Sequence, residues 1–77
     1  MNRKIKLIWD FKGADSLKTA EHQAFHLKEF AIKEHLHFYE SSSTKLSELH
    51  AIAFIIVDEA DMKIYRDALK PHRGEVA

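Results

Sequence analysis

The stretch LHAIAFIIV, residues 49–57, decides how this chain folds. It contains an uninterrupted apolar run from Ala51 to Val57, rich in isoleucine, phenylalanine and valine, which favour extended strands. A strand that is apolar at both odd and even positions is buried on both faces. We therefore predict that it lies in the centre of a sheet. The run is too short to cross a membrane, which takes about 20 residues in a helix.

The residues just before this strand predict its hairpin partner. Residues 38–45 have a weaker strand pattern, because Ser41, Ser42 and Ser43 interrupt the apolar positions. The hairpin turn is expected at Lys45–Glu48.

Residues 3–11 predict a second half-buried strand that ends at Lys12–Gly13. Apolar and polar residues alternate with a period of two, which is typical of a strand with one face against the core. The expected core face holds Ile5, Leu7, Trp9 and Phe11; the other face holds Lys4, Lys6, Asp10 and Ile8.

Between these strands, a helical period extends from Asp15 or Ser16, either of which can cap the helix, to about His37. The helix is about 33 Å long, which matches a strand of nine residues running back along it. Its apolar residues form one stripe, with a flank on one side of it. The stripe is Leu17, Ala20, Ala24, Leu27, Phe30 and Ala31, and the flank is Phe25, Ile32 and Leu36.

A second helix is predicted after residue 57. Asp58 can cap it, and acidic residues through Asp61 suit the positive end of the helix dipole. Lys70 should end the helix, because the residue before a proline avoids the helical conformation. We expect residues 72–77 to form a loose tail, with a strand over residues 74–76 as the alternative.

The element order β-α-β-β-α predicts a single α+β domain over residues 1–77. A right-handed crossover would place the third strand beside the first, and both helices would cover one face of the sheet. This two-layer sandwich resembles the ferredoxin-like fold with its last strand missing or reduced. The resemblance lies in element order and implies no function.

Composition excludes several classes of protein. The chain has no cysteine, which excludes disulfide scaffolds, thiolate metal sites and thiol nucleophiles. Its 12 basic and 12 acidic residues give no net charge, which argues against a dedicated nucleic-acid binder. The segment MNRKIKLIWDF is too short in apolar residues and too charged for a signal peptide. We expect a cytoplasmic protein without membrane contact and without a cofactor.

Two of the six histidines, His22 and His26, share a helix face with Glu29. Imidazoles four positions apart can bind one metal ion, and a carboxylate can complete the set. Because this face lies opposite the apolar stripe, we expect a solvated surface and no stoichiometric metal.

A second group, His35, His37, Tyr39 and His50, offers weak candidates for acid–base catalysis. Histidine suits this chemistry because its usual pKa of about 6.5 lies near neutral pH. The sequence alone pairs none of them with a nucleophile or an orienting carboxylate.

The central strand points to self-association. Two helices can cover only one face, so large apolar side chains on the other face would stand in water, which usually marks an interface. We therefore expect a homodimeric structural or interaction domain, joined sheet to sheet. The alternative is a small cofactor-free enzyme or ligand binder with a pocket between sheet and helix, whose ligand no motif identifies; weak metal binding is the third hypothesis. The predicted interface residues are Ile8, Ile52, Phe54 and Ile56. Because the central strand is apolar at odd and even positions alike, its pattern leaves open which of its faces belongs to the core.

Overall fold

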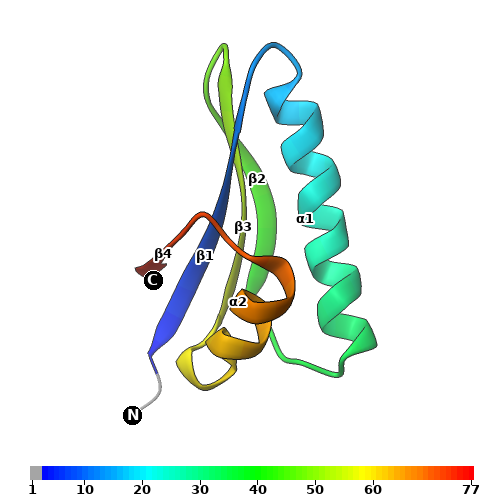
Figure 1. The fold of residues 1–77 in the computed structure, drawn as a ribbon, viewed down its shortest axis with the longest axis vertical. Coiled ribbons are helices and arrows are strands. Elements are labelled where there is room, and N and C mark those ends of the chain that lie inside the picture. Colours follow the sequence, from blue (N-terminus) through cyan, green and yellow to red (C-terminus); the bar gives the residue numbers. More distant parts are fainter. Residues whose placement is uncertain (1–2) are drawn as a thin grey trace.

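The computed structural model describes residues 3–77, which form a two-layer α+β sandwich (Figure 1). Four antiparallel strands make one sheet in the order β2-β3-β1-β4. The sandwich is as predicted, whereas its closer likeness to the ferredoxin-like fold stays a prediction. The elements are β1 (Lys4–Lys12), α1 (Ser16–Lys33), β2 (Glu40–Ser47), β3 (His50–Asp58), the 3-10 turn η1 (Glu59–Asp61), α2 (Met62–Leu69) and β4 (Arg73–Val76).

β3 is a central strand, as its apolar run predicts. It pairs along its whole length with β1, from Lys12 opposite His50 to Lys4 opposite Asp58. On its other side it pairs with β2, and the hairpin between them carries a bulge at Lys45–Ser47. β2 begins two residues later than predicted and extends two residues further.

Both helices pack on one face of the sheet, with α1 along its length and α2 near the end where β3 finishes (Figure 1). The predicted core face of β1 is confirmed, since Ile5, Leu7 and Trp9 are buried against the helices. α1 contributes a stripe of small residues that lets the helix lie close to the sheet. Its buried apolar residues are Ala20, Ala24, Leu27 and Ala31.

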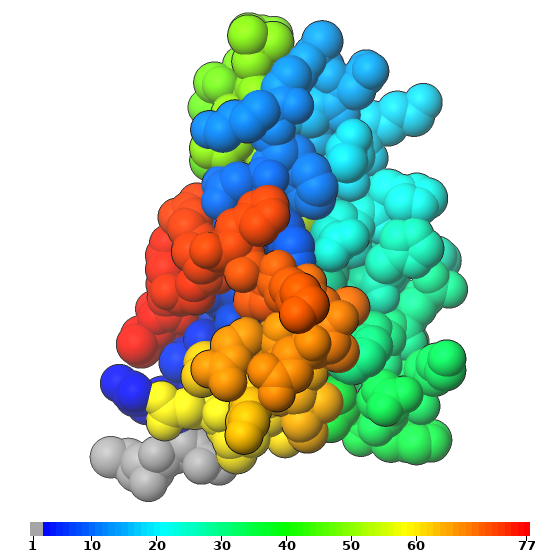
Figure 2. All heavy atoms as spheres, in the orientation of Figure 1, coloured from blue at the N-terminus to red at the C-terminus, as the bar shows by residue number. Residues whose placement is uncertain are grey.

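The two helices also contact each other. Tyr65 of α2 is fully buried, and its ring centroid lies 5.6 Å from that of Phe30 on α1. The space-filling view shows α1 and α2 side by side over the sheet (Figure 2). The core is therefore shared by the sheet and both helices.

α1 ends at Lys33, four residues before the predicted end. His35 adopts a left-handed conformation with φ 56°, and its N–H donates to the Ile32 carbonyl. The Leu36 N–H donates to the Ala31 carbonyl at 2.8 Å, which completes a Schellman motif. The apolar period continues through Leu36 because this residue still packs on the core after the helix has ended.

The predicted side-chain caps are wrong. Neither Asp15 nor Asp58 makes a capping hydrogen bond. The Asp58 carboxylate instead accepts from the Tyr39 hydroxyl, and η1 precedes α2. α2 does end at Lys70, which has φ 46°.

The end of the chain forms β4, the alternative to a loose tail. The Trp9 indole N–H donates to the Leu69 carbonyl at 2.9 Å, where α2 ends. The His72 N–H then donates to the Ile8 carbonyl at 2.9 Å, so the chain leaves α2 directly onto the edge of β1. Residues 73–76 follow as an antiparallel edge strand.

Candidate functional site

The four predicted interface residues form one apolar cluster on the sheet face away from the helices. We call this surface the open face and the group Ile8, Ile52, Phe54 and Ile56 the open-face cluster. Ile8 lies directly opposite Phe54 in the register of β1 and β3. The expectation that these side chains stand in water is wrong for three of them, since Ile8, Ile52 and Phe54 are 1%, 6% and 7% exposed.

Long charged side chains account for this shielding. The Lys6 ammonium lies 4.3 Å from the Phe54 ring centroid. Arg73 of β4 is paired with Ile8 and extends its guanidinium to Asp10. Such side chains cover apolar surface with their methylene stems and keep their charges in water. The open face is therefore an apolar centre under a charged border.

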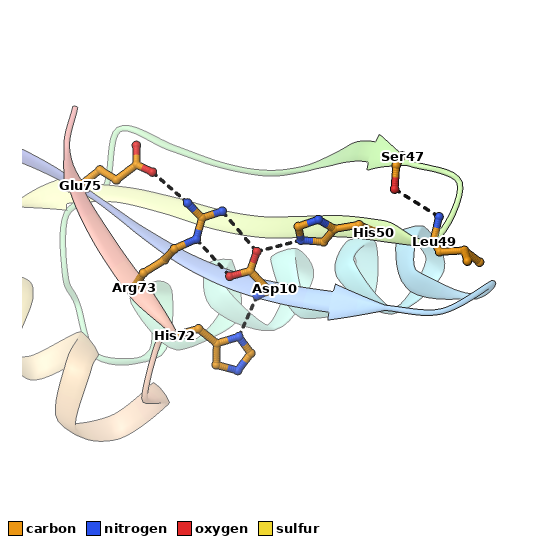
Figure 3. A network of polar contacts seen from close by, with 7 residues as sticks. All are labelled: Asp10, Ser47, Leu49, His50, His72, Arg73 and Glu75. Carbon is orange, nitrogen blue, oxygen red and sulfur yellow. Dashed lines mark hydrogen bonds and ion pairs between the residues drawn. The ribbon is translucent and has the colours of Figure 1, made fainter.

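Asp10 is the centre of a polar network that crosses three strands (Figure 3). Its Oδ2 accepts from Arg73 Nε at 3.0 Å, and its Oδ1 accepts from Arg73 Nη2 at 3.2 Å. The same Oδ1 lies 2.9 Å from His50 Nε2. Arg73 Nη1 also donates to Glu75 at 3.1 Å. β3, β1 and β4 are thus joined by side chains as well as by backbone.

This network stabilises the charged forms of Asp10 and Arg73. The Arg73 hydrogen bonds lower the pKa of Asp10 from 3.8 to about 2; partial burial opposes this, and the bond from His50 assists it. The same hydrogen bonds raise the pKa of Arg73. An ionised carboxylate only accepts hydrogen bonds, so the contact assigns the proton to His50 Nε2 and leaves Nδ1 as the acceptor nitrogen of a neutral ring. A histidine oriented by a carboxylate has the geometry of a general base.

His72 binds the same segment from the backbone side. Its Nδ1 accepts from the Asp10 backbone N–H at 2.8 Å, so the ring carries its proton on Nε2. If β4 began earlier, a backbone carbonyl of that strand would accept from the Asp10 N–H. The His72 imidazole takes the place of that carbonyl. This contact fixes the start of β4 on β1.

The predicted catalytic group is divided between two ends of the sheet. His50 begins β3, whereas Tyr39 donates to Asp58 at the other end of that strand, at 2.6 Å. This hydrogen bond raises the pKa of Tyr39. The His37 ring lies edge-on to Tyr39 with centroids 4.7 Å apart, and His35 ends α1. Within residues 3–77, His50 is the only one of the three histidines with a carboxylate partner, and Tyr39 pairs with a different carboxylate at the far end of β3. The four residues therefore do not form one site.

Sequence reasoning missed Asp10 as the partner of His50, and it missed the contacts of Asp10 with Arg73 and His72. A charged residue within the β1 pattern and a basic pair after Pro71 are the only local signals. Neither signal indicates that β4 returns to β1.

The predicted metal ligands lie on the exposed side of α1, as expected. The rings of His22 and His26 are 4.5 Å apart, and His26 Nδ1 lies 3.1 Å from Glu29 Oε1. Over residues 3–77, no three histidine or carboxylate side chains are grouped so that they could hold a metal ion.

Two shallow grooves of about 430 and 410 Å³ lie at the start of α1. Most of the residues that line them are of charged or polar types, and none of the candidate catalytic residues is among them. The larger groove is lined by Ala14, Asp15, Ser16, Leu17, Lys18, Glu21, Lys45 and Glu48, and the smaller by Asp15, Lys18, Thr19 and His22.

Comparison with known proteins finds no matching family model, no matching curated protein and no matching solved structure.

Neither helix in the described part of the chain combines the length and the apolar character needed to cross a membrane.

Proposed function

We propose that this protein is a small homodimeric interaction domain whose open face binds a second copy. The observation that carries the proposal is the open-face cluster, four large apolar side chains on a sheet face that neither helix covers. Strands of a two-sided apolar sheet are normally covered on both faces. A two-fold, sheet-to-sheet contact supplies the missing layer.

The charges around the open-face cluster suit a contact between identical surfaces. Lys6 lies opposite Glu75 in the register of β1 and β4, and Arg73 donates to Asp10. Glu40 of β2 lies opposite Ile56 of β3. A surface with both signs can match cations to carboxylates across a two-fold axis. Lys6, which is in no ion pair within residues 3–77, can turn outward and pair with a carboxylate of a second copy.

We further infer that the sandwich is a reduced ferredoxin-like fold. The element order β-α-β-β-α-β supports this relation, with η1 as a short extension of the second helix. β4, at four residues, is the reduced last strand.

The second candidate function is a small enzyme or ligand binder. One observation favours it, the 2.9 Å contact between His50 and Asp10 with both side chains partly exposed. The two grooves at the start of α1 do not adjoin this pair. The geometry therefore supports the interaction domain better.

The test is a mass measurement of the assembly in solution. Ile56 is the most exposed member of the open-face cluster, so Ile56→Glu should leave the chain folded while placing a carboxylate in the contact. Ile8→Glu is a poor probe, because Ile8 is 1% exposed and a charge there would unfold the chain itself. Light scattering after size exclusion should give half the wild-type mass for Ile56→Glu.

Ile64→Glu is the matched control, because Ile64 is an exposed isoleucine on α2, away from the open face. Its assembly mass should equal that of the wild type. Circular dichroism checks that both variants are folded. A folded Ile56→Glu variant with unchanged mass would show that the open face is not an interface.

A further inference from the structure

The edge strand β2 leaves one side of the sheet open to a further strand. Among the strands of residues 3–77, β2 pairs only with β3, and its eight residues contain no proline. Most of its side chains are exposed, and most are small hydroxyl residues. An edge of this length with unpaired backbone groups is a template for another strand. The opposite edge, β4, has only four residues.

Two exposed apolar side chains of α1 stand beside this edge. Phe25 is 60% exposed and Ile32 is 69% exposed. α1 lies over β2 and β3, and the buried Ser41 hydroxyl donates to the Ala24 carbonyl at 3.0 Å. Phe25 and Ile32 are each about 140° or more around the helix from Phe30, which faces α2. They therefore point away from α2, toward the β2 side.

The β2 side of α1 has a sequence that complements its own antiparallel copy. A two-fold axis beside Ala24 and Phe25 would place Glu21 of one copy against Lys28 of the other. Both side chains are exposed, and neither makes an ion pair within residues 3–77. The same axis would place Leu17 against Ile32. The surface thus matches charge with charge of opposite sign and apolar with apolar.

One axis can serve the helices and the strands together. Because Ser41 is bonded to Ala24, the axis beside Ala24 passes close to Ser42 of β2. Two copies of β2 would then pair antiparallel with Ser42 opposite Ser42. Strands in a sheet are about 4.8 Å apart. A helix lying across β2 and β3 would therefore be about 10 Å from its copy, which is within helix packing distance.

We propose that a second copy of this chain binds at β2 and the adjoining side of α1, which extends the sheet across a two-fold axis. This surface is distinct from the open face, so the proposal goes beyond the proposed function and does not depend on it. If the open face and the β2 edge are both occupied, each chain contacts one copy through the open face and a different copy through the β2 edge.

A charge exchange tests the helix contact. Glu21→Lys sets lysine against Lys28 of the second copy, and Lys28→Glu sets glutamate against Glu21. Each change alters two symmetric contacts and should weaken this association about tenfold or more. The double variant Glu21→Lys/Lys28→Glu restores both pairs and should regain the wild-type association. Lys63→Glu on α2 is the control for a charge change elsewhere.

The readout is the assembly mass by light scattering across a dilution series. The proposal is wrong if both single variants dissociate at the same protein concentration as the wild type. It is also wrong if the double variant associates no more tightly than the single variants. A mass change with Ile56→Glu and none with these variants would support the open face and reject the edge contact. The reverse result would reject the open face alone.

Cross-linking tests the strand register. The chain has no cysteine, so Ser42→Cys introduces one thiol, next to its own copy at the axis. Mild oxidation should give a covalent dimer that elutes like the wild type. Thr44→Cys places its thiols about four residues apart along the strand and should remain uncross-linked. Absence of the Ser42→Cys dimer, or equal cross-linking of both variants, would overturn the proposed pairing.

Discussion

Replacing Asp10 with asparagine should destabilise the protein at neutral pH. The size of the loss follows from how far folding lowers the pKa of Asp10. Arg73 and His50 lower the pKa of Asp10 from 3.8 to about 2 in the folded chain. Each pKa unit corresponds to about 1.4 kcal/mol. Asp10 is 22% exposed but Arg73 is 46% exposed, so solvent screening reduces the expected loss to about 1–2 kcal/mol. Asp10→Asn keeps the shape of the side chain and removes the charge.

The stabilisation that the Asp10 carboxylate provides should decrease as the pH falls. A carboxylate whose pKa is lowered by folding stabilises the folded state fully above its unfolded value, here 3.8. That contribution is lost as the pH falls through about 2. The difference in unfolding free energy between the wild type and Asp10→Asn should therefore be about 1–2 kcal/mol at pH 7, shrink below pH 4 and almost vanish at pH 2.

Urea denaturation measures these free energies at fixed protein concentration. Trp9 is the only tryptophan and is buried, so its fluorescence reports unfolding. Asp67→Asn, at an exposed carboxylate of α2, controls for the general loss of a negative charge and should change stability by about 0.5 kcal/mol or less. A difference for Asp10→Asn that is absent at pH 7, or equally large at pH 2, would refute the reasoning.

Three further predictions concern Trp9, Gly13 and the histidines of α1. Trp9→Phe removes the hydrogen bond to the Leu69 carbonyl and should cost about 1 kcal/mol in urea denaturation, whereas Trp9→Ala should cost about 3–5 kcal/mol; equal losses would contradict the assigned contact. Gly13→Ala should lower stability by about 1–2 kcal/mol in thermal denaturation, because Gly13 has φ 106° and the added methyl group meets open space, so only backbone strain acts. Calorimetry of tag-free protein with zinc should give no submicromolar one-to-one isotherm; one that His26→Ala abolishes would overturn this.

The sequence determined which face of β1 meets the helices, whereas the helix side of β3, apolar on both faces, was decided by its register with β1. Alternation in β1 assigned Trp9 to the helix side and Ile8 to the open face, and the structure agrees. The apolar run of residues 51–57 predicted the central position of β3. These features depend on the period of two in a strand, which neighbouring residues express without reference to the rest of the fold.

Local patterns were less reliable at the ends of elements. The apolar period of α1 continues through Leu36, past the last helical residue. The left-handed residue that ends the helix is a histidine, His35, so no glycine marks this end in the sequence. β4 has little pattern of its own in four residues. It is ordered by the edge of β1, by the His72 contact and by the Asp10–Arg73 pair.

Only the tertiary structure brought the polar network together. Asp10 is 40 residues from His50 and 63 from Arg73, and their contact depends on the register of β1 with β3 and with β4. It also decided that long side chains of the border shield Ile8 and Phe54. The period of two in a strand shows from the sequence which side chains lie on each face. Which of them meet depends on strand pairing, which is fixed only when distant segments pack together.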